Sequence, residues 1–219
     1  MSPAAPVALP GLAGKTVVVT GALGGQGIAE TLALLASAAD VIATDLAPGP
    51  STELTDAAAP LPGTLTYRQL DVSSEGGWAA LAEFATGLGG GVQGLVNNAG
   101  IPFRARLGDI ELADWDRVIG INLTGPMLGI RTLSPLMPRG ASIVNVGSLA
   151  GLNAHHTVAY TTSKWGLRGL THVAATELGA RGIRVNIVHP GYVETPMMAA
   201  APAIMTEAQL ALTPLERTA

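Results

Sequence analysis

The sequence predicts an α/β fold in which a doubly wound parallel sheet lies between two layers of helices. Short runs of β-branched residues alternate with longer helical segments along the chain. These runs are apolar on both faces, which is typical of strands in a parallel sheet that helices cover on both sides. A glycine-rich stretch directly follows the first run, at the position where such sheets bind ligands.

The first half of the chain contains four of the predicted strands. They comprise residues 16–19, 41–44, 65–70 and 94–96, and the helices between them comprise residues 28–37 and 78–86. The strands are rich in Val, Ile and Thr, whereas the first helix is rich in Ala and Leu. Residues 47–63 are rich in Pro, Ala, Ser and Thr, so we expect a surface loop or a short helix there.

The second half continues the alternation. We expect a long helix at residues 115–136, a strand at 142–146, a helix at 158–180 and a sixth strand at 183–188. Gly125 and Pro126 are unfavourable residues near the start of the long helix. Because the sequence shows neither an internal repeat nor an interdomain linker, we expect a single domain over residues 1–219.

Composition narrows the possible functions. The chain has 219 residues, of which 48% are hydrophobic and 13% are charged, and its net charge is −4. This charge does not favour nucleic-acid binding, and no apolar run is long enough to cross a bilayer. The chain has no cysteines and its His, Asp and Glu residues lack metal-ligand spacing, so no metal site is expected. The beginning of the sequence does not resemble a signal peptide, and we expect a cytoplasmic protein.

The stretch at residues 20–28 predicts a dinucleotide site. Gly21, Gly25 and Gly27 permit a tight turn and a close approach of the backbone to a pyrophosphate. The helix that begins near Ile28 presents unpaired N–H groups to the phosphates. A glycine-rich stretch can also be an ordinary turn, but its position between a buried strand and a helix favours phosphate binding.

Acidic residues after the second and third strands extend this site. Asp45 lies where dinucleotide-binding folds place an acid for the adenosine ribose, with Leu46 beside it, although an acid can also end a strand by solvation. A carboxylate repels a 2′-phosphate, so we expect NAD rather than NADP. Asp71 and Val72 follow the third strand and are candidates for the adenine edge, but Asp71 could equally cap a helix.

Tyr160 and Lys164 suggest proton transfer. A spacing of four residues places them one turn apart on one helix face. A phenol has a pKa of about 10, and a nearby ammonium group favours the phenolate. A tyrosine whose pKa moves toward neutrality can exchange a proton with an alcohol or a ketone.

Together these residues resemble the short-chain dehydrogenase/reductase family, which has a Rossmann-type fold. Residues 20–27 match its cofactor motif, and residues 97–100 its fourth-strand motif. Asn122, Ser148, Tyr160 and Lys164 match its catalytic tetrad, and residues 190–195 match its nicotinamide segment. The motifs follow the family order from residue 14 to about residue 198.

The resemblance implies a role for each matched residue. Tyr160 would be the general acid or base, and Ser148 would bind the substrate oxygen. Lys164 would hold the nicotinamide ribose, and Asn122 would hold a water that relays protons. Asn98, Ala99 and Gly100 would line the adenosine ribose side, and Val193 and Thr195 the carboxamide.

The tetrad residues also have ordinary structural interpretations. Taken singly, Ser148 could cap a turn, Tyr160 could be a half-buried aromatic residue, and Asn122 could cap a local turn. His155 and His156 lie between Ser148 and Tyr160, where they could be catalytic but more simply are exposed loop residues.

Residues 163–170 and 184–191 most resemble NAD-dependent bacterial hydroxysteroid dehydrogenases. Residues 196–219 would comprise the substrate lid and the truncated end of the chain. Met197, Met198 and the alanines at 199–201 would make the lid adaptable and apolar, so we expect an apolar or cyclic alcohol or ketone as substrate. The last helix and strand of the family have no counterpart before Ala219, so we expect a truncated sequence rather than a natural loss. The resemblance also implies a homodimer or homotetramer packed through the helices with Asn122 and Tyr160.

Two other functions are compatible with a dinucleotide site. A non-catalytic NAD-binding sensor or subunit would have little use for the Ser148, Tyr160 and Lys164 set. Reductases of activated C=C bonds resemble this family but space their Tyr and Lys more widely. The sequence therefore favours an NAD-dependent oxidoreductase that interconverts a secondary alcohol and its ketone.

Overall fold

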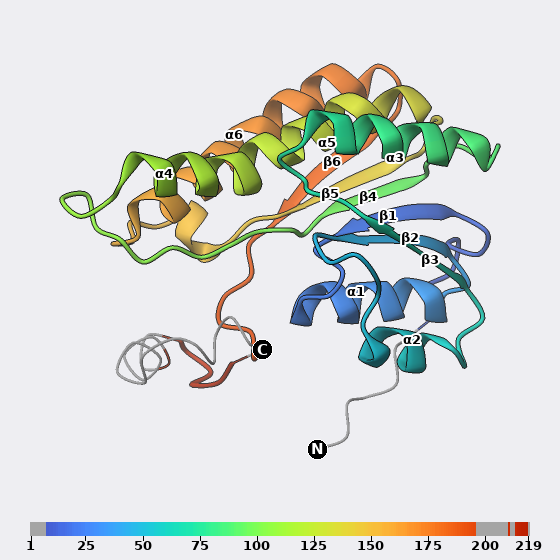
Figure 1. Ribbon diagram of the computed structural model, residues 1–219, viewed down its shortest axis with the longest axis horizontal. Helices are drawn as coiled ribbons and strands as arrows, with labels where there is room; N and C mark the ends of the chain where they lie inside the picture. Colours follow the sequence, from blue (N-terminus) through green and yellow to red (C-terminus); the bar gives the residue numbers. More distant parts are fainter. Residues whose placement is uncertain (1–7, 196–209, 211–212, 219) are drawn as a thin grey trace.

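The computed structural model describes residues 8–195, 210 and 213–218. These residues form a six-stranded sheet between two layers of helices (Figure 1). Its strands are β1 (Thr16–Thr20), β2 (Asp40–Asp45), β3 (Thr64–Gln69), β4 (Gly94–Asn97), β5 (Ser142–Val146) and β6 (Arg184–Val188). All neighbours pair in parallel in the order β3-β2-β1-β4-β5-β6, which confirms the predicted doubly wound fold. The strand order reverses between β1 and β4, where open sheets of this kind bind ligands.

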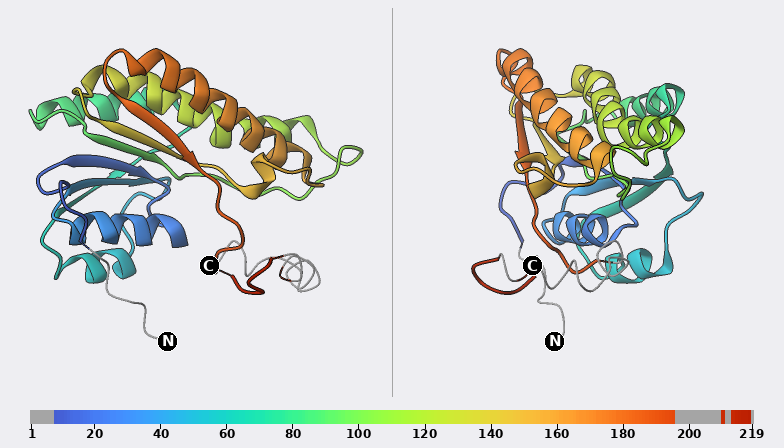
Figure 2. Two further views of the ribbon diagram at one scale, coloured as in Figure 1. Left: turned by 180° about the vertical axis from the view of Figure 1, so that it is seen from behind. Right: turned by 90° about the vertical axis from the view of Figure 1, so that its left-hand side faces the viewer.

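The helices divide between the two faces of the sheet. Figures 1 and 2 show α1 (Gly25–Ala36) and α2 (Thr52–Ala58) on one face. The other face carries α3 (Glu75–Gly87), α4 (Leu112–Ile119), α5 (Gly125–Leu133) and α6 (Val158–Gly179). Of the two expectations for residues 47–63, the short helix forms, because the Ser51 side chain accepts a hydrogen bond from Leu54 N–H and caps α2.

The long helix predicted over residues 115–136 forms, but its hydrogen-bonding pattern changes along its length. The segment comprises α4, a π-helical turn η1 (Gly120–Thr124), α5 and a final 3₁₀ turn η2 (Ser134–Leu136). Pro126 has no N–H, so the Asn122 carbonyl cannot receive the α-helical hydrogen bond that residue 126 would otherwise donate. The π-helical turn therefore forms directly before the proline and contains Asn122.

Two hydrophobic clusters hold the layers together. One packs β1 and β2 against α1 and α2 through residues such as Val19, Leu35 and Leu54. The other packs the opposite face of the sheet against α3, α5 and α6 and includes the fully buried Trp78. In the part of the chain that the structure describes, no helix combines the length and apolarity needed to cross a membrane. Most of the predicted substrate lid, including Met197 and Met198, lies outside the described residues.

Candidate active site

A cavity of about 500 Å³ lies where the strand order reverses. It runs from the turn between β1 and α1, past the carboxyl ends of β2, β4 and β5, to Tyr160 on α6. The predicted residues that line it are Gly21, Gly25, Asp45, Leu46, Asp71, Val72, Asn98, Ala99, Gly100, Tyr160, Lys164 and Thr195.

The turn after β1 requires glycine at two positions. Gly21 has a φ of +64°, and a Cβ there would lie 2.8 Å from the Ala99 Cα atom. A Cβ on Gly27 would lie 2.1 Å from the Gly21 carbonyl oxygen. Gly21 therefore lets the turn lie against the end of β4, and Gly27 lets α1 begin against the turn. Gly27 lies behind the cavity wall rather than in it.

Asn98 holds the same turn from the side. Its Nδ2 donates hydrogen bonds of 3.0 Å to the carbonyl oxygens of Thr20 and Gly21. The Thr20 hydroxyl oxygen in turn accepts from the N–H groups of Asn98 and Ala99, both at 3.1 Å. These four hydrogen bonds fix the glycine turn to the end of β4.

Asp45 lies at the carboxyl end of β2 and faces the glycine turn. One carboxylate oxygen accepts from Leu23 N–H at 3.0 Å, and the other accepts from Leu46 N–H at 2.7 Å. The carboxylate is consequently held at the wall of the cavity with its charge on the side where β2 ends. Of the described residues that line the cavity, Lys164 is the one cation, and it lies near Tyr160 rather than near Asp45.

Asp71 does not cap the helix that follows it. Its Oδ1 accepts from the N–H and the hydroxyl of Ser73, at 2.9 and 2.7 Å, whereas Ser74 caps α3 by accepting from Gly77 N–H. This local turn places Asp71 and Val72 in the cavity wall. The helix-cap alternative for Asp71 is therefore wrong, and its place at the adenine edge stays a prediction.

Tyr160 and Lys164 line the far end of the cavity, and the side chain of Ser148, which lies outside the lining, contacts Tyr160 there. Lys164 Nζ lies 5.7 Å from the centroid of the Tyr160 ring, and it donates a 2.8 Å hydrogen bond to the Val146 carbonyl oxygen. Ser148 follows β5 and caps the 3₁₀ turn η3 (Leu149–Gly151) by accepting from Ala150 N–H at 3.1 Å. Ser148 therefore caps a turn and also contacts Tyr160 through its side chain, and its role toward a substrate oxygen stays a prediction.

The pKa directions differ from the sequence expectation. Burial raises the pKa of Tyr160, and its contact with the Ser148 side chain lowers it again in part. Burial lowers the pKa of Lys164 to about 8. The sequence predicted a lowered pKa for Tyr160, but burial of the phenol is the larger influence and raises it. The Lys164 ammonium group donates to a backbone carbonyl.

Asn122 bonds across the molecule rather than to its own turn. Its Oδ1 accepts from Ile101 N–H at 2.9 Å, and its Nδ2 donates to the Ile101 carbonyl oxygen at 3.0 Å. Nδ2 also donates to the Ser163 hydroxyl, which donates to the Tyr160 carbonyl oxygen at 2.7 Å. Asn122 therefore connects the loop after β4 to the helix that carries Tyr160 and Lys164.

The cavity does not include every predicted residue. Its lining lacks four further predicted residues, which are Ile28, Asn122, Ser148 and Val193. The N–H group of Ile28 already donates to the Gly24 carbonyl oxygen at the start of α1. The sequence missed several lining residues, which comprise Leu23, Gly24, Gln26, Leu70, Ile101, Ile121, Val146 and Gly147. Most of them directly adjoin a predicted residue in sequence, which is the signal that could have identified them.

The two loop histidines show no catalytic contact. His155 Nδ1 lies 3.3 Å from the Thr157 hydroxyl, and His156 is exposed. Within the described ranges, no group of three or more His, Cys, Asp or Glu residues could hold a metal ion.

Known proteins are similar to this chain in sequence and in fold. The family profile described as short chain dehydrogenase matches residues 15–204. A 3-alpha-(or 20-beta)-hydroxysteroid dehydrogenase of Mycobacterium bovis is 41% identical over 191 residues, which are 85% of this chain and 72% of the relative. A trans-4-hydroxycyclohexanecarboxylate dehydrogenase of Sinomonas cyclohexanicum is 37% identical over 86% of this chain and 76% of its own.

A solved structure shares the fold. It is a short-chain dehydrogenase/reductase, titled glucose/ribitol dehydrogenase, from Brucella melitensis. It superposes with a TM-score of 0.84 and 32% sequence identity, over 94% of this chain and 84% of its own.

Proposed function

The chain belongs to the short-chain dehydrogenase family of oxidoreductases, and we propose that it interconverts a secondary alcohol and its ketone with NAD as the hydride carrier. The convergence of Ser148, Tyr160 and Lys164 at one end of the cavity carries the proposal, because the glycine turn lies at the other end.

The cavity fits a dinucleotide. Gly21 and Gly25 would face the pyrophosphate, Asp45 and Leu46 the adenosine ribose, and Asp71 and Val72 the adenine. Asn98, Ala99 and Gly100 would lie along the ribose side. Val193 and Thr195, after β6, would face the carboxamide. The cofactor would supply or accept the hydride when bound.

The protein's own contribution is proton transfer. Tyr160 would give its hydroxyl proton to the forming alkoxide in reduction and remove the proton in oxidation. Ser148 would donate a hydrogen bond to the same substrate oxygen and fix it beside the phenol. Lys164, with its pKa lowered to about 8, can hold or release a proton near neutral pH. Asn122 would carry the relay toward solvent from the π-helical turn.

Asp45 supports NAD over NADP. Its carboxylate is fixed by the N–H groups of Leu23 and Leu46, so it cannot turn away from a phosphate on the ribose. None of the described lining residues near Asp45 is a cation that would neutralise such a phosphate.

An apolar or cyclic substrate is the third element of the proposal. The relatives named for hydroxysteroid and hydroxycyclohexanecarboxylate substrates both act on rings, and they share 41% and 37% identity with this chain.

We also propose a homodimer or homotetramer packed through α4, α5 and α6. Trp165 and Val173 on α6 and Leu112 on α4 are large exposed apolar residues that such packing would cover. Sedimentation that detects monomer alone would contradict the oligomer.

A cofactor and substrate screen tests the proposed activity. The protein would be incubated with NAD⁺ and secondary alcohols, and with NADH and ketones, including cyclic and steroidal ones, while absorbance of the reduced cofactor is followed. We expect turnover of at least one ring substrate, and NADPH to bind at least about tenfold more weakly than NADH in a fluorescence titration. Cofactor binding without any turnover would favour the non-catalytic alternative, and tighter binding of NADPH would contradict the role of Asp45.

A further inference from the structure

The backbone carbonyl of Ser148 is held by a side chain from a different strand. His189 directly follows β6, and its Nδ1 lies 2.8 Å from the Ser148 carbonyl oxygen. Because a carbonyl oxygen only accepts hydrogen bonds, Nδ1 carries the hydrogen and donates it. The imidazole is therefore held in the Nδ1–H form by this contact.

Two glycines make room for the imidazole. A Cβ on Gly147 would lie 2.8 Å from His189 Nδ1, and a Cβ on Gly151 would lie 3.4 Å from His189 Cε1. These glycines stand on either side of Ser148 in the chain. The imidazole ring thus packs against the backbone on both sides of Ser148. A methyl group at position 147 would displace the ring.

Backbone hydrogen bonds join the same two segments. Gly147 N–H donates to the Val188 carbonyl oxygen at 2.7 Å, and Leu149 N–H donates to the Pro190 carbonyl oxygen at 3.0 Å. Between these two bonds lies the Ser148 carbonyl, which His189 satisfies. The imidazole therefore adds a third hydrogen bond between the two segments, at the residue between the two backbone bonds.

We propose that His189 is a positioning residue for the Ser148 hydroxyl, an inference that rests on the proposed function. Its Nδ1–H bond fixes the peptide plane after Ser148 and, through it, the direction in which the side chain leaves the backbone toward Tyr160. The same bond ties this serine to the segment that continues to Thr195 in the cavity wall. Substrate oxygen and nicotinamide would then be held by one connected unit.

Three substitutions separate this role from simple packing. His189→Asn keeps an N–H donor at nearly the distance of Nδ1 from the backbone, whereas His189→Gln places its amide one methylene farther away. His189→Ala removes the donor. We expect kcat to fall about tenfold in His189→Ala and His189→Gln, as for the loss of one orienting hydrogen bond, and to recover most of its value in His189→Asn.

The accompanying measurements define the outcome. The Kd of NADH should stay within about twofold of wild type in all three variants, since the glycine turn is untouched. The exposed His172 on α6 supplies the control, and His172→Ala should leave kcat unchanged. Wild-type kcat in folded His189→Ala, or equal losses in His189→Asn and His189→Gln, would overturn the positioning role. A wild-type protein that turns over no alcohol or ketone would instead reject the proposed function itself.

Discussion

Around the Gly21 turn, polar side chains bond the backbone, whereas around Tyr160 and Lys164 they also bond one another. Asp45 and Asn98 both contact main-chain N–H or C=O groups of the turn. Near the tetrad, Asn122 donates to the Ser163 hydroxyl. Asn97, at the end of β4, donates to Asn145 on β5. All four of these side chains are buried. The first region fixes the shape of a binding surface, and the second fixes the directions of individual reactive groups.

Each region also contains an ionisable side chain with buried atoms, and the two side chains differ in their hydrogen bonding. Lys164 Nζ donates to the Val146 carbonyl oxygen. Glu30, on α1 beside the glycine turn, has a buried Oε2 without a hydrogen-bond partner, and burial raises its pKa to about 7. We therefore expect substitutions near the turn to change stability and cofactor affinity, and substitutions near the tetrad to change turnover.

The largest expected effect is that of Tyr160→Phe. It removes the proton donor but keeps the ring, so kcat should fall by a factor on the order of 10² to 10⁴ while the Kd of NADH changes little. Steady-state kinetics with a substrate from the screen and a fluorescence titration measure the two quantities.

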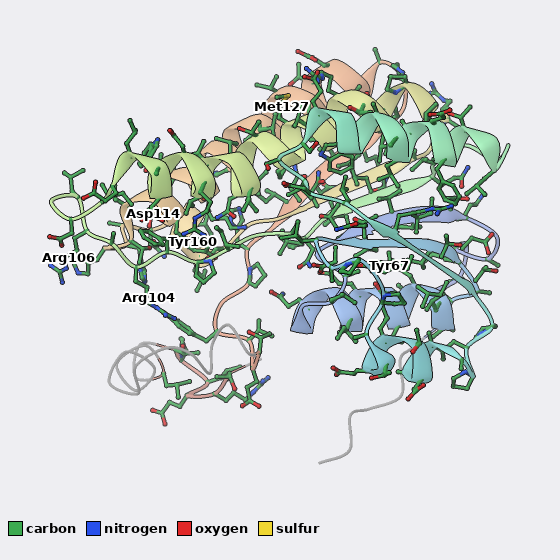
Figure 3. All side chains as sticks on the ribbon, in the orientation of Figure 1. Tyr67, Arg104, Arg106, Asp114, Met127 and Tyr160 are labelled. Atoms are coloured by element: carbon green, nitrogen blue, oxygen red, sulfur yellow. The ribbon has the colours of Figure 1, made fainter. Side chains whose placement is uncertain are left out.

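Tyr67→Phe is the matched control for this substitution. Tyr67 also has a bonded hydroxyl, which donates to the Ala47 carbonyl oxygen at 2.7 Å, but it lies on β3, well away from Tyr160 (Figure 3). Its kcat should equal that of wild type. A similar loss in both variants would contradict a proton-transfer role specific to Tyr160.

Gly27→Ala should act on the binding region instead. The new Cβ would lie 2.1 Å from the Gly21 carbonyl oxygen, so the turn and α1 must separate. We expect a loss of about 3 kcal/mol in the free energy of unfolding and weaker NADH binding. Gly169→Ala, in an exposed part of α6 with nothing within 4 Å of the added Cβ, should stabilise by up to about 1 kcal/mol. Urea denaturation would compare the stability of the two variants, and equal midpoints would refute the steric requirement at Gly27.

The smallest expected effect concerns Glu30 and pH. The folded protein keeps a proton on Glu30 up to about pH 7, because burial raises its pKa, whereas the unfolded chain releases it near the ordinary pKa of 4.5. Between these values the native state binds more protons, so the free energy of unfolding falls as pH rises and stays lower above pH 7. Glu30→Gln should remove this fall and be more stable than wild type at pH 8 by roughly 1 to 3 kcal/mol.

Urea midpoints at pH 5 and pH 8 would measure the effect of Glu30. Glu83→Gln, at an exposed position of α3, provides the control and should keep the pH dependence of wild type. A Glu30→Gln protein whose stability still falls between the two pH values would show that another group causes the change.

Sequence patterns located the strands and the tetrad better than the contacts between them. The fifth strand was predicted with its observed bounds, because buried β-branched runs flanked by turn residues are a local signal. The π-helical turn was not predicted, since its hydrophobic spacing differs little from that of an α-helix. The bonds of Asn122 to Ile101 and of His189 to Ser148 span 21 and 41 residues, and no local pattern encodes them.

The direction of the Tyr160 pKa shift shows a second limit of sequence reasoning. A spacing of four residues correctly places Lys164 near the phenol, within 5.7 Å of its ring centroid. It does not reveal how far burial desolvates the phenol, or that the ammonium group has a carbonyl partner of its own. Both the desolvation of the phenol and the hydrogen bond of the ammonium group depend on the packing of β5 against α6.

The π-helical turn at Gly120–Thr124 also sets how α4 and α5 face the rest of the molecule. A π-helical turn holds one more residue than an α-helical turn, and each residue of an α-helix advances by about 100°. The π-helical turn therefore offsets by about that angle the side chains of α5 that face the sheet from those expected for an ordinary α-helix. Leu128 and Leu133 are among the α5 side chains that are buried as a result. An ordinary turn at this point would direct a different set of α5 side chains toward the sheet.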